Sequence, residues 1–353
     1  MDDFDLLVLG DCNPDLVLSG ADVRPRFGQQ ERLVDEGRLT IGGSGAILAC
    51  AAARLGLRTA LAAVVGDDVL GHWMLDQLAG RGVEVGGCVV DPVRPTGLTV
   101  VLSEPGDRAI LTAVGTIAAL RVEDVDPDRR RAARHLHVSS YYLQTALRPG
   151  LGRLFRQARS EGRGTSVDPN WDPAEAWDSG LHALLPHTDC LLPNAEEAMR
   201  IAATAAPATR PVDPTGAVAE SGAGAEGGAV ANGAVTGGVE AAAGALAAAG
   251  PLVAVKLGAA GALAAAPGGR RTVRAAVPSA AAGTVADTTG AGDSFDAGFL
   301  YGHLSGWPLD RSLALGCACG ALSTRAAGGT AAQPTLDEAL RTLGTGAAGL
   351  RPG

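Results

Sequence analysis

Strand-like segments alternate with longer helical stretches along most of this 353-residue chain. The first segment, residues 4–9, is an apolar run that ends at Gly10 and Asp11, which is typical of a buried central strand leading into a loop. Similar segments recur at residues 59–65, 135–139, 164–168, 189–192 and 252–256. The helical stretches between them supply the crossovers that parallel pairing requires. The alternation therefore predicts an α/β fold with a mostly parallel sheet covered by helices on both faces.

One segment interrupts this order. Residues 204–239 contain no aromatic residue, Leu, Ile or Met, and consist mostly of Ala, Gly, Pro and Thr. Such a segment buries too little apolar area to offset an ordering entropy of about 1–2 kcal/mol per residue. We expect a flexible surface insertion over residues 204–239, followed by a helix over residues 240–249 that leads into the next strand.

The charge balance argues against two broad classes of partner. Lys and Arg total 29 against 38 Asp and Glu, so the net charge at pH 7 is −9. An acidic chain without a long basic run lacks the electrostatic footprint of a nucleic-acid or membrane-surface binder. The acidic first residues do not resemble a secretory signal, and six scattered cysteines are typical of reduced thiols. We expect a cytoplasmic protein that binds neither nucleic acid nor membrane.

The segment most informative about chemistry is Asp-Thr-Thr-Gly-Ala-Gly-Asp at residues 287–293, which opens a helical stretch. Small residues at a helix start let backbone N–H groups approach an anion, and the helix dipole adds positive charge there. Asp293 lies in the first turn of that helix, where a carboxylate suits a base that takes a proton from an attacking hydroxyl. The alternative is an ordinary helix start with an Asp near the dipole. No P-loop and no complete dinucleotide fingerprint occurs in the chain.

Residues 287–293 resemble the C-terminal signature of the ribokinase-like (PfkB) carbohydrate kinase family. The resemblance covers nearly the whole chain apart from the insertion, and five further segments carry it in the family's order. They are Gly-Gly-Ser-Gly-Ala at residues 42–46 with the helix ending at Gly56, Val-Gly-Asp-Asp at 65–68, Asp-Pro-Asn at 168–170, Asn-Ala-Glu-Glu at 194–197, and Lys-Leu-Gly at 256–258 with Gly261.

The resemblance implies a single three-layer α/β/α domain over residues 1–353, with a small β lid formed by segments at about 12–41 and 95–115. The implied activity is ATP-dependent phosphorylation of a hydroxyl of a sugar or sugar-like alcohol. Asp293 is then the general base, and the backbone N–H groups of Gly290, Ala291 and Gly292 form an anion hole for the transferred phosphoryl group.

On the nucleotide side, the resemblance implies binding by five residues: Asn194, Lys256, Gly258, Gly261 and Thr288. Glu197 is implied to organise Mg²⁺ through waters, because Mg²⁺ keeps several of its waters. The alternative for Glu197 is a favourable charge in the first turn of a helix. Asp287 is implied as a site for a monovalent cation such as K⁺, and its alternative is a helix cap or a turn.

On the acceptor side, the matching residues are Asp15 and Asn13, together with Gly42 and Gly43. A carboxylate accepts hydrogen bonds from the vicinal hydroxyls of a sugar, and glycines let the sugar ring approach the backbone. Relatives usually carry Asn at the position of Ile47, and many carry Arg near residues 171–172, where this chain has Trp and Asp. These departures leave the acceptor open.

Two functions other than a sugar kinase fit the same sequence features. The family also phosphorylates nucleosides, whose base would require an aromatic ring for stacking. A sensor that binds sugar or nucleotide without catalysis is a third alternative, although Asp293, Gly290 and Gly292 are intact. In this family a lid sheet with one apolar face often pairs two copies of the chain, so a homodimer through the lid is a further expectation.

Overall fold

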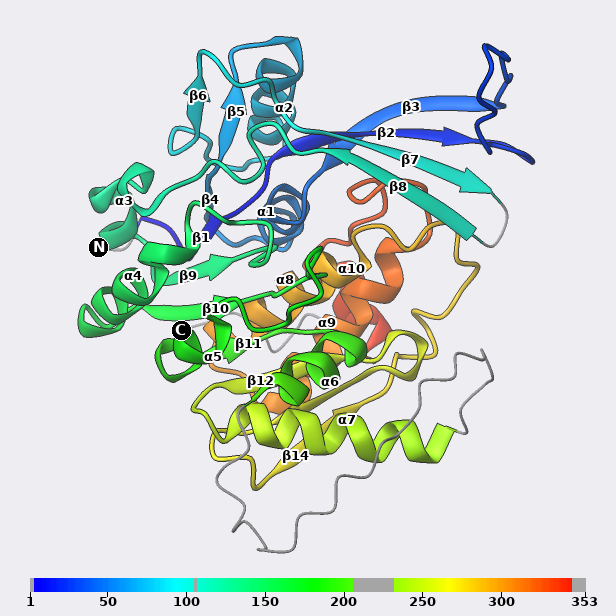
Figure 1. Ribbon diagram of the computed structural model, residues 1–353. Coiled ribbons are helices and arrows are strands. Elements are labelled where there is room, and N and C mark those ends of the chain that lie inside the picture. The colour runs from blue at the N-terminus through cyan, green and yellow to red at the C-terminus, as the bar shows by residue number, and fades with distance from the viewer. Residues whose placement is uncertain (1–2, 105–106, 206–231, 345–353) are drawn as a thin grey trace, which may run out of the picture.

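The computed structural model describes residues 3–104, 107–205 and 232–344, and its largest element is a sheet of eight strands (Figure 1). Its order is β14-β13-β12-β11-β10-β9-β1-β4. The six strands from β12 to β4 are parallel, whereas β13 and β14 each run antiparallel to the preceding strand. The strands are β4 (Thr59–Ala62), β1 (Leu6–Leu9), β9 (His135–Val138), β10 (Gly164–Val167), β11 (Cys190–Leu191), β12 (Leu252–Lys256), β13 (Ala262–Ala265) and β14 (Thr272–Ala275).

Helices cover both faces of this sheet. Successive side chains of a strand point to opposite faces, and in β1 Leu6 and Val8 belong to one buried apolar cluster while Leu7 and Leu9 belong to another. The first cluster includes side chains of α1 (Ser44–Arg54), α2 (Val69–Ala79), α8 (Ala291–Leu304), α9 (Leu309–Ser323) and α10 (Leu336–Thr342). The second includes side chains of α4 (Arg148–Ser160), α5 (Leu181–Leu184), α6 (Ala195–Thr204) and α7 (Asn232–Ala247). The short α3 (Pro127–Ala132) precedes β9.

A second sheet of four strands, which we call the lid, projects from this body (Figure 1). Its order is β3-β2-β7-β8, with β2 and β7 parallel and both outer pairs antiparallel. The lid strands are β3 (Glu36–Gly42), β2 (Asn13–Ser19), β7 (Leu98–Glu104) and β8 (Asp107–Ala113). They fall in the two segments expected to form a lid. A separate parallel pair joins β5 (Val64–Gly66) and β6 (Val89–Asp91).

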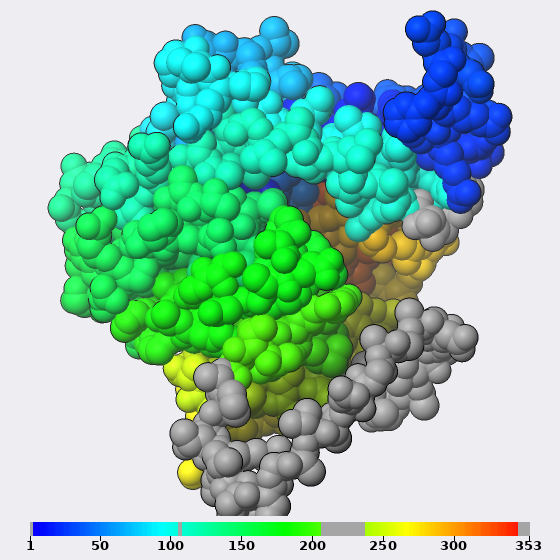
Figure 2. All heavy atoms as spheres, viewed as in Figure 1, coloured from blue at the N-terminus to red at the C-terminus, as the bar shows by residue number. Residues whose placement is uncertain are grey.

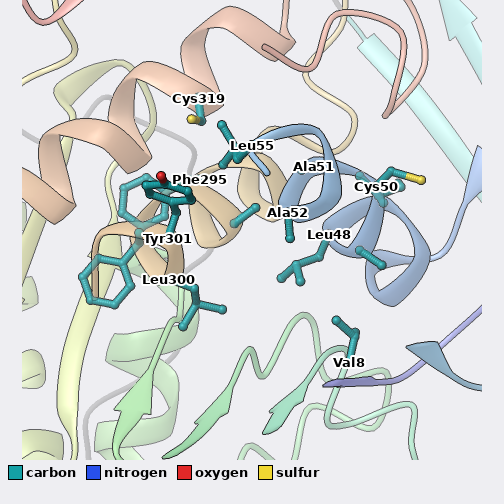
Figure 3. Packing of buried hydrophobic residues seen from close by; sticks show 14 of the residues in the cluster. Val8, Leu48, Cys50, Ala51, Ala52, Leu55, Phe295, Leu300, Tyr301 and Cys319 are labelled. Atoms are coloured by element: carbon teal, nitrogen blue, oxygen red, sulfur yellow. The ribbon is translucent and has the colours of Figure 1, made fainter. Parts of the chain in front are cut away.

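Glycines let α8 and α9 pack backbone against backbone. A Cβ on Gly298 would lie 2.8 Å from the Cys319 sulfur, and a Cβ on Gly302 would lie 2.9 Å from the Ser312 Cα. On the opposite side of α8, Figure 3 shows side chains of α1 and of Leu55, the residue that follows it, packed against Phe295 and its neighbours, with Val8 of β1 on the sheet side. This packing holds α8, whose N-terminal turn carries the sequence signature, between the sheet and two helices.

The structure confirms the predicted α/β/α architecture and corrects one boundary. We expected an insertion over residues 204–239, but α7 begins at Asn232 and the side chain of Val239 is buried against the second cluster. The added part of the helix, residues 232–239, contains three glycines and only one alanine. Burial of Val239 against the second cluster, and not intrinsic helix propensity, therefore accounts for the longer helix. The middle of the expected insertion, residues 206–231, lies outside the described residues. Among the described helices, none is long and apolar enough to cross a bilayer.

Replacing Gly302 by Ala should destabilise the protein by about 1–3 kcal/mol, because its Cβ would overlap the α9 backbone. Gly237→Ala in α7 is the matched control, since the glycine is exposed and a Cβ there meets no atom within 4 Å. The control should be neutral or stabilising by about 0.5–1 kcal/mol. Urea unfolding of both variants measures the difference, and equal effects would contradict the close α8–α9 contact.

Candidate active site

Polar side chains gather where the parallel strands end. Asp11 follows β1, Ser140 follows β9, Asp168 follows β10, Asn194 follows β11, and Lys256 ends β12. Ligands of open α/β sheets bind at this edge, beyond the carboxyl ends of the strands. Figure 2 shows the surface hollowed beneath the lid strands, between them and the body of the molecule, with the chain around residue 300 visible inside.

At this edge, the ammonium group of Lys256 is buried between two carboxylates. Its Nζ lies 3.1 Å from Asp168 Oδ2 and 3.0 Å from Asp296 Oδ2. Burial alone would lower the pKa of Lys256, but the charges of Asp168 and Asp296 raise it overall. Burial and the charge of Asp168 raise the pKa of Asp296, whereas Lys256 holds the pKa of Asp168 down against the effect of burial. We expected Lys256 at the nucleotide, and its described partners are these carboxylates.

The expected anion hole is a tight turn above this ammonium. Gly290 is the N-cap of α8 with a φ of 72°, and a Cβ there would lie 2.8 Å from both Gly329 Cα and Ile47 Cγ2. A Cβ on Gly292 would lie 3.8 Å from Lys256 Nζ, so the ammonium is close to the turn. The three backbone N–H groups expected to form the anion hole are not equally available. The N–H of Ala291 already donates to the Thr288 carbonyl at 3.2 Å. Within the described residues, the N–H groups of Gly290 and Gly292 have no protein acceptor.

Asp293 lies in the first turn of α8 and meets the first turn of α1. The Ser44 hydroxyl, which belongs to the double-glycine segment, donates to Asp293 Oδ1. Burial and the charge of Asp168 raise the pKa of Asp293 to about 7, although the Ser44 bond lowers it. A carboxyl with such a pKa is suited to proton transfer near neutral pH. The contact joins the two motifs that the sequence placed on the phosphoryl and acceptor sides.

The expected acceptor residues also lie together, under the lid. A Cβ on Gly42 would lie 1.9 Å from Asp15 Oδ1, so the carboxylate occupies space that only glycine leaves open. The Asn13 amide donates to Asp15 Oδ1 at 3.3 Å and to Thr99 Oγ1 of the lid at 3.2 Å. Gly43 has a φ of 80°, which glycine adopts without strain. Burial and the charge of Asp11 raise the pKa of Asp15 to about 7.

Asp11, which no sequence motif singled out, organises the start of α1. Its carboxylate accepts hydrogen bonds from the N–H groups of Ser44 at 3.1 Å and Gly45 at 2.9 Å, and from the Ser140 hydroxyl at 3.2 Å. Ser140 has a φ of 52° and Asn170 a φ of 56°, and their side chains share a hydrogen bond at 3.2 Å. Strained non-glycine residues at strand ends often mark functional sites.

Glu197 and Asn194 form a reciprocal cap at the start of α6. The Asn194 N–H and amide donate to the two Glu197 oxygens at 2.8 and 2.6 Å, and Glu197 N–H donates back to the Asn194 side chain at 2.9 Å. Burial and the charge of Asp168 raise the pKa of Glu197 to about 7. In the described part of the chain, no group of three or more His, Cys, Asp or Glu is placed to hold a metal ion.

Asp287 ties the signature to two other segments. It accepts hydrogen bonds from the N–H and hydroxyl of Thr289, both at 2.8 Å, and from the N–H of Gly328 at 2.8 Å. Arg108 of the lid lies 3.5 Å from Asp287 Oδ1 and donates to the Thr289 hydroxyl at 2.8 Å. The backbone and side-chain bonds to Asp287 hold its pKa low despite its partial burial. These contacts match the turn alternative for Asp287.

The remaining residues expected to bind the nucleotide are Gly258, Gly261 and Thr288. Gly261 has a φ of 90°, and a Cβ there would lie 2.1 Å from the Ala275 carbonyl, so packing against β14 requires glycine. Gly258 and Thr288 are exposed, and the Thr288 carbonyl is the acceptor for Ala291. Gly258 and Gly261 lie in the turn between β12 and β13, and Thr288 lies just before the N-cap of α8. The structure assigns no ligand to any of the three.

The family of this chain follows from its match to a family model. Residues 3–336 match the model of the pfkB family carbohydrate kinases. This chain belongs to the pfkB carbohydrate kinase family. The match confirms the predicted family and the prediction that the protein is a carbohydrate kinase.

Individual relatives of this pfkB kinase are distant but span most of the chain. An uncharacterised sugar kinase of Archaeoglobus fulgidus is 27% identical over 74% of this chain and 90% of its own length. A 5-dehydro-2-deoxygluconokinase of Geobacillus thermodenitrificans is 27% identical over 84% of this chain and 82% of its own. The structure of a putative ribokinase II from E. coli in complex with ATP and Mg²⁺ has the same fold, with a TM-score of 0.75 and 22% identity over 97% of this chain and 99% of that one.

Lys256→Met should lower the free energy of unfolding of the kinase by about 3–5 kcal/mol at pH 8, because it leaves buried carboxylates without their cation. The loss of stability in Lys256→Met should be smaller near pH 5, because Asp168 and Asp296 can take up protons there and no longer need a cation. Arg153→Met is the control, because that exposed guanidinium pairs with an exposed Glu123. Denaturant unfolding at both pH values measures the effect, and a pH-independent loss would contradict the electrostatic explanation.

Proposed function

We propose that this kinase transfers the γ-phosphoryl group of ATP to a hydroxyl of a small sugar or sugar-like alcohol, with Asp293 as the general base. The contact of Asp293 with Ser44 carries the proposal. It places one carboxyl between the Gly290 turn, which suits a phosphoryl group, and the Gly42 segment, which suits the acceptor. The pKa of about 7 lets that carboxyl exchange a proton near neutral pH.

In the proposed reaction, the acceptor hydroxyl gives its proton to Asp293 while its oxygen bonds to the γ-phosphorus of ATP. The bond from that phosphorus to the bridging oxygen breaks, and ADP leaves with the electron pair. The N–H groups of Gly290 and Gly292 stabilise the charge on the transferring group, and Lys256 beneath Gly292 adds a positive charge. The N–H of Ala291 can join this anion hole only when it leaves the Thr288 carbonyl. The proposal therefore relies first on the other two of the three expected N–H donors.

Mg²⁺ belongs to the same proposal, as the ion that neutralises charge on the ATP phosphates. Glu197 and Asn194 would hold it through waters, since both Glu197 oxygens already accept bonds from Asn194. The ATP and Mg²⁺ bound to the E. coli fold neighbour support this assignment. Binding of the nucleotide by Lys256, Gly258, Gly261 and Thr288 stays a prediction. So does a K⁺ ion at Asp287, where Arg108 already supplies positive charge.

On the acceptor side, Asp15 and Asn13 are proposed to bind hydroxyls above Gly42 and Gly43. The lid presents hydroxyl groups there, because Thr99 receives the Asn13 amide and lies 3.2 Å from the Thr112 hydroxyl. Neighbouring hydroxyls suit a polyhydroxy acceptor, either a free sugar or the ribose of a nucleoside, and a nucleoside base would in addition require an aromatic partner. The names of the relatives, sugar kinase and 5-dehydro-2-deoxygluconokinase, also favour a sugar.

A homodimer through the lid and a cytoplasmic location complete the proposal. The edge strands of the lid, β3 and β8, expose Leu39, Ile110 and Leu111. Exposed apolar side chains on a sheet edge are typical of a surface that pairs with another chain. All six cysteines are free thiols in the structure, as a reducing compartment would require.

Asp293→Asn should lower kcat by about 10²–10⁴ while leaving the affinity for an ATP analogue nearly unchanged. In the wild-type enzyme, kcat should fall as the pH drops below about 7, because Asp293 then becomes protonated. ADP release in a screen of pentoses, hexoses, sugar acids and nucleosides identifies the acceptor for these assays. Asp310→Asn, at an exposed position in the first turn of α9, is the control. Wild-type turnover in folded Asp293→Asn would remove Asp293 from the mechanism.

Asp15→Ala should lower kcat/KM for the acceptor at least tenfold, since each charge-assisted hydrogen bond contributes about 1.5–3 kcal/mol. Calorimetry should show ADP affinity close to that of the wild type, because Asp15 lies on the acceptor side. Asp128→Ala removes an exposed carboxylate and serves as control. Loss of ADP binding with an unchanged acceptor KM would mean that the two ends of the cleft are assigned the wrong way round.

A further inference from the structure

A second pocket, with a volume of about 500 Å³, lies away from the acceptor and phosphoryl residues. It opens between the C-terminal ends of α1 and α9 and the helix α10, and residues 331–334 form another wall. Three arginines line it, one from each of these elements: Arg54 at the end of α1, Arg325 just after α9, and Arg341 in α10. Neither Asp15 nor Asp293 lines this pocket.

The pocket is positively charged although the chain as a whole is acidic. Glu338 is the only carboxylate among its lining residues. Its Oε2 accepts hydrogen bonds from the N–H of Thr335 at 2.7 Å and from the Thr335 hydroxyl at 2.8 Å. These bonds hold the pKa of Glu338 below its usual range, with a smaller contribution from the nearby charges of Arg54 and Arg341. Three guanidinium groups and one carboxylate leave the pocket with two net positive charges.

Most N–H groups of these arginines are available for a ligand. Arg54 uses its Nε to donate to the Gln333 carbonyl, and Arg325 uses Nη2 to donate to the Ala280 and Ala281 carbonyls at 3.4 and 3.3 Å. The charge of Arg341 acts on Glu338, but within residues 3–104, 107–205 and 232–344 the guanidinium of Arg341 makes no direct hydrogen bond or ion pair. Each guanidinium has five N–H donors in a planar fork. The pocket therefore combines excess charge with unused donors on rigid helix ends.

We propose that this pocket binds a phosphate group that carries two negative charges, as inorganic phosphate or as the phosphate ester of a small molecule. The guanidinium fork matches the spacing of phosphate oxygens and bonds two of them at once. A dianion also balances the net charge of the lining residues. The volume leaves room for a small group attached to the phosphate.

The bound phosphate would connect segments that lead to the active site. Arg325 already holds the loop at residues 280–281, which runs on to Asp287. The wall at residues 331–334 continues from Gly328, whose N–H donates to Asp287. A ligand that bridges Arg325 and Arg341 therefore fastens α10 to both segments and should raise the melting temperature.

The test is calorimetric titration of the full chain with inorganic phosphate and, separately, with glycerol 3-phosphate. Saturating Mg²⁺ and a non-hydrolysable ATP analogue are present throughout, so that the phosphoryl site is occupied. We expect one equivalent to bind, with affinity at least tenfold weaker in Arg341→Gln and unchanged in Arg153→Gln, which alters an exposed arginine of α4. Tighter binding of glycerol 3-phosphate would identify an ester as the ligand, and tighter binding of inorganic phosphate would identify the free ion.

Arg341 makes no described contact that holds the fold, so Arg341→Gln should keep wild-type kcat and melting temperature when phosphate is absent. The melting temperature of the wild type, but not of Arg341→Gln, should rise on addition of phosphate. Absence of binding to the wild type, or equal affinity in Arg341→Gln, would overturn the proposal. Both readouts are independent of the acceptor sugar, so they do not depend on the proposed reaction.

Discussion

The ion pairs of Lys256 with Asp168 and Asp296 hold the active edge of the sheet together. They join the ends of β10 and β12 to the first turns of α8, three elements that are far apart in the chain. Removing these charges from water is costly, and only their mutual attraction and hydrogen bonds offset the cost. The same ammonium lies near the Gly292 turn, so one group both stabilises the strand ends and lies beside the proposed site of the transferring phosphoryl group of ATP.

The two ends of the cleft meet through short contacts made by the starts of α1 and α8. Asp11 fixes the first N–H groups of α1, and Ser44 on that same turn reaches Asp293. Close glycine packing against α9 keeps α8 in place on the other side. Arg108 adds a contact from the lid to Thr289, so the cover of the acceptor side touches the phosphoryl side directly. Motion of the lid would have to break that bond.

The sequence predicts the fold well because apolar runs and glycine-rich turns are local features. The motif at residues 287–293 could be singled out from its neighbours alone, whereas Asp15 and the double glycine were assigned through the resemblance to the family. Asp11 could be found in neither way, since its importance comes from Ser44 and Ser140, which only the fold brings near. Lys256 was expected at the nucleotide because of the resemblance, and its ion pairs with Asp168 and Asp296 were not predicted. One signal of a special role was available in the sequence, because Lys256 is the only lysine in the chain, whereas the other cationic side chains are arginines.

This single lysine has a consequence for how the protein can be studied. An ε-amino group reacts with acylating and methylating reagents only when it is neutral and reachable, and in this structure Lys256 is charged and held between carboxylates. Every other basic side chain is an arginine or a histidine. Isotopic methylation of the lysine in briefly opened molecules would therefore introduce a single side-chain amine signal. Its rate of appearance would report how often the strand-end cluster comes apart, without any mutation and without a background of surface lysines.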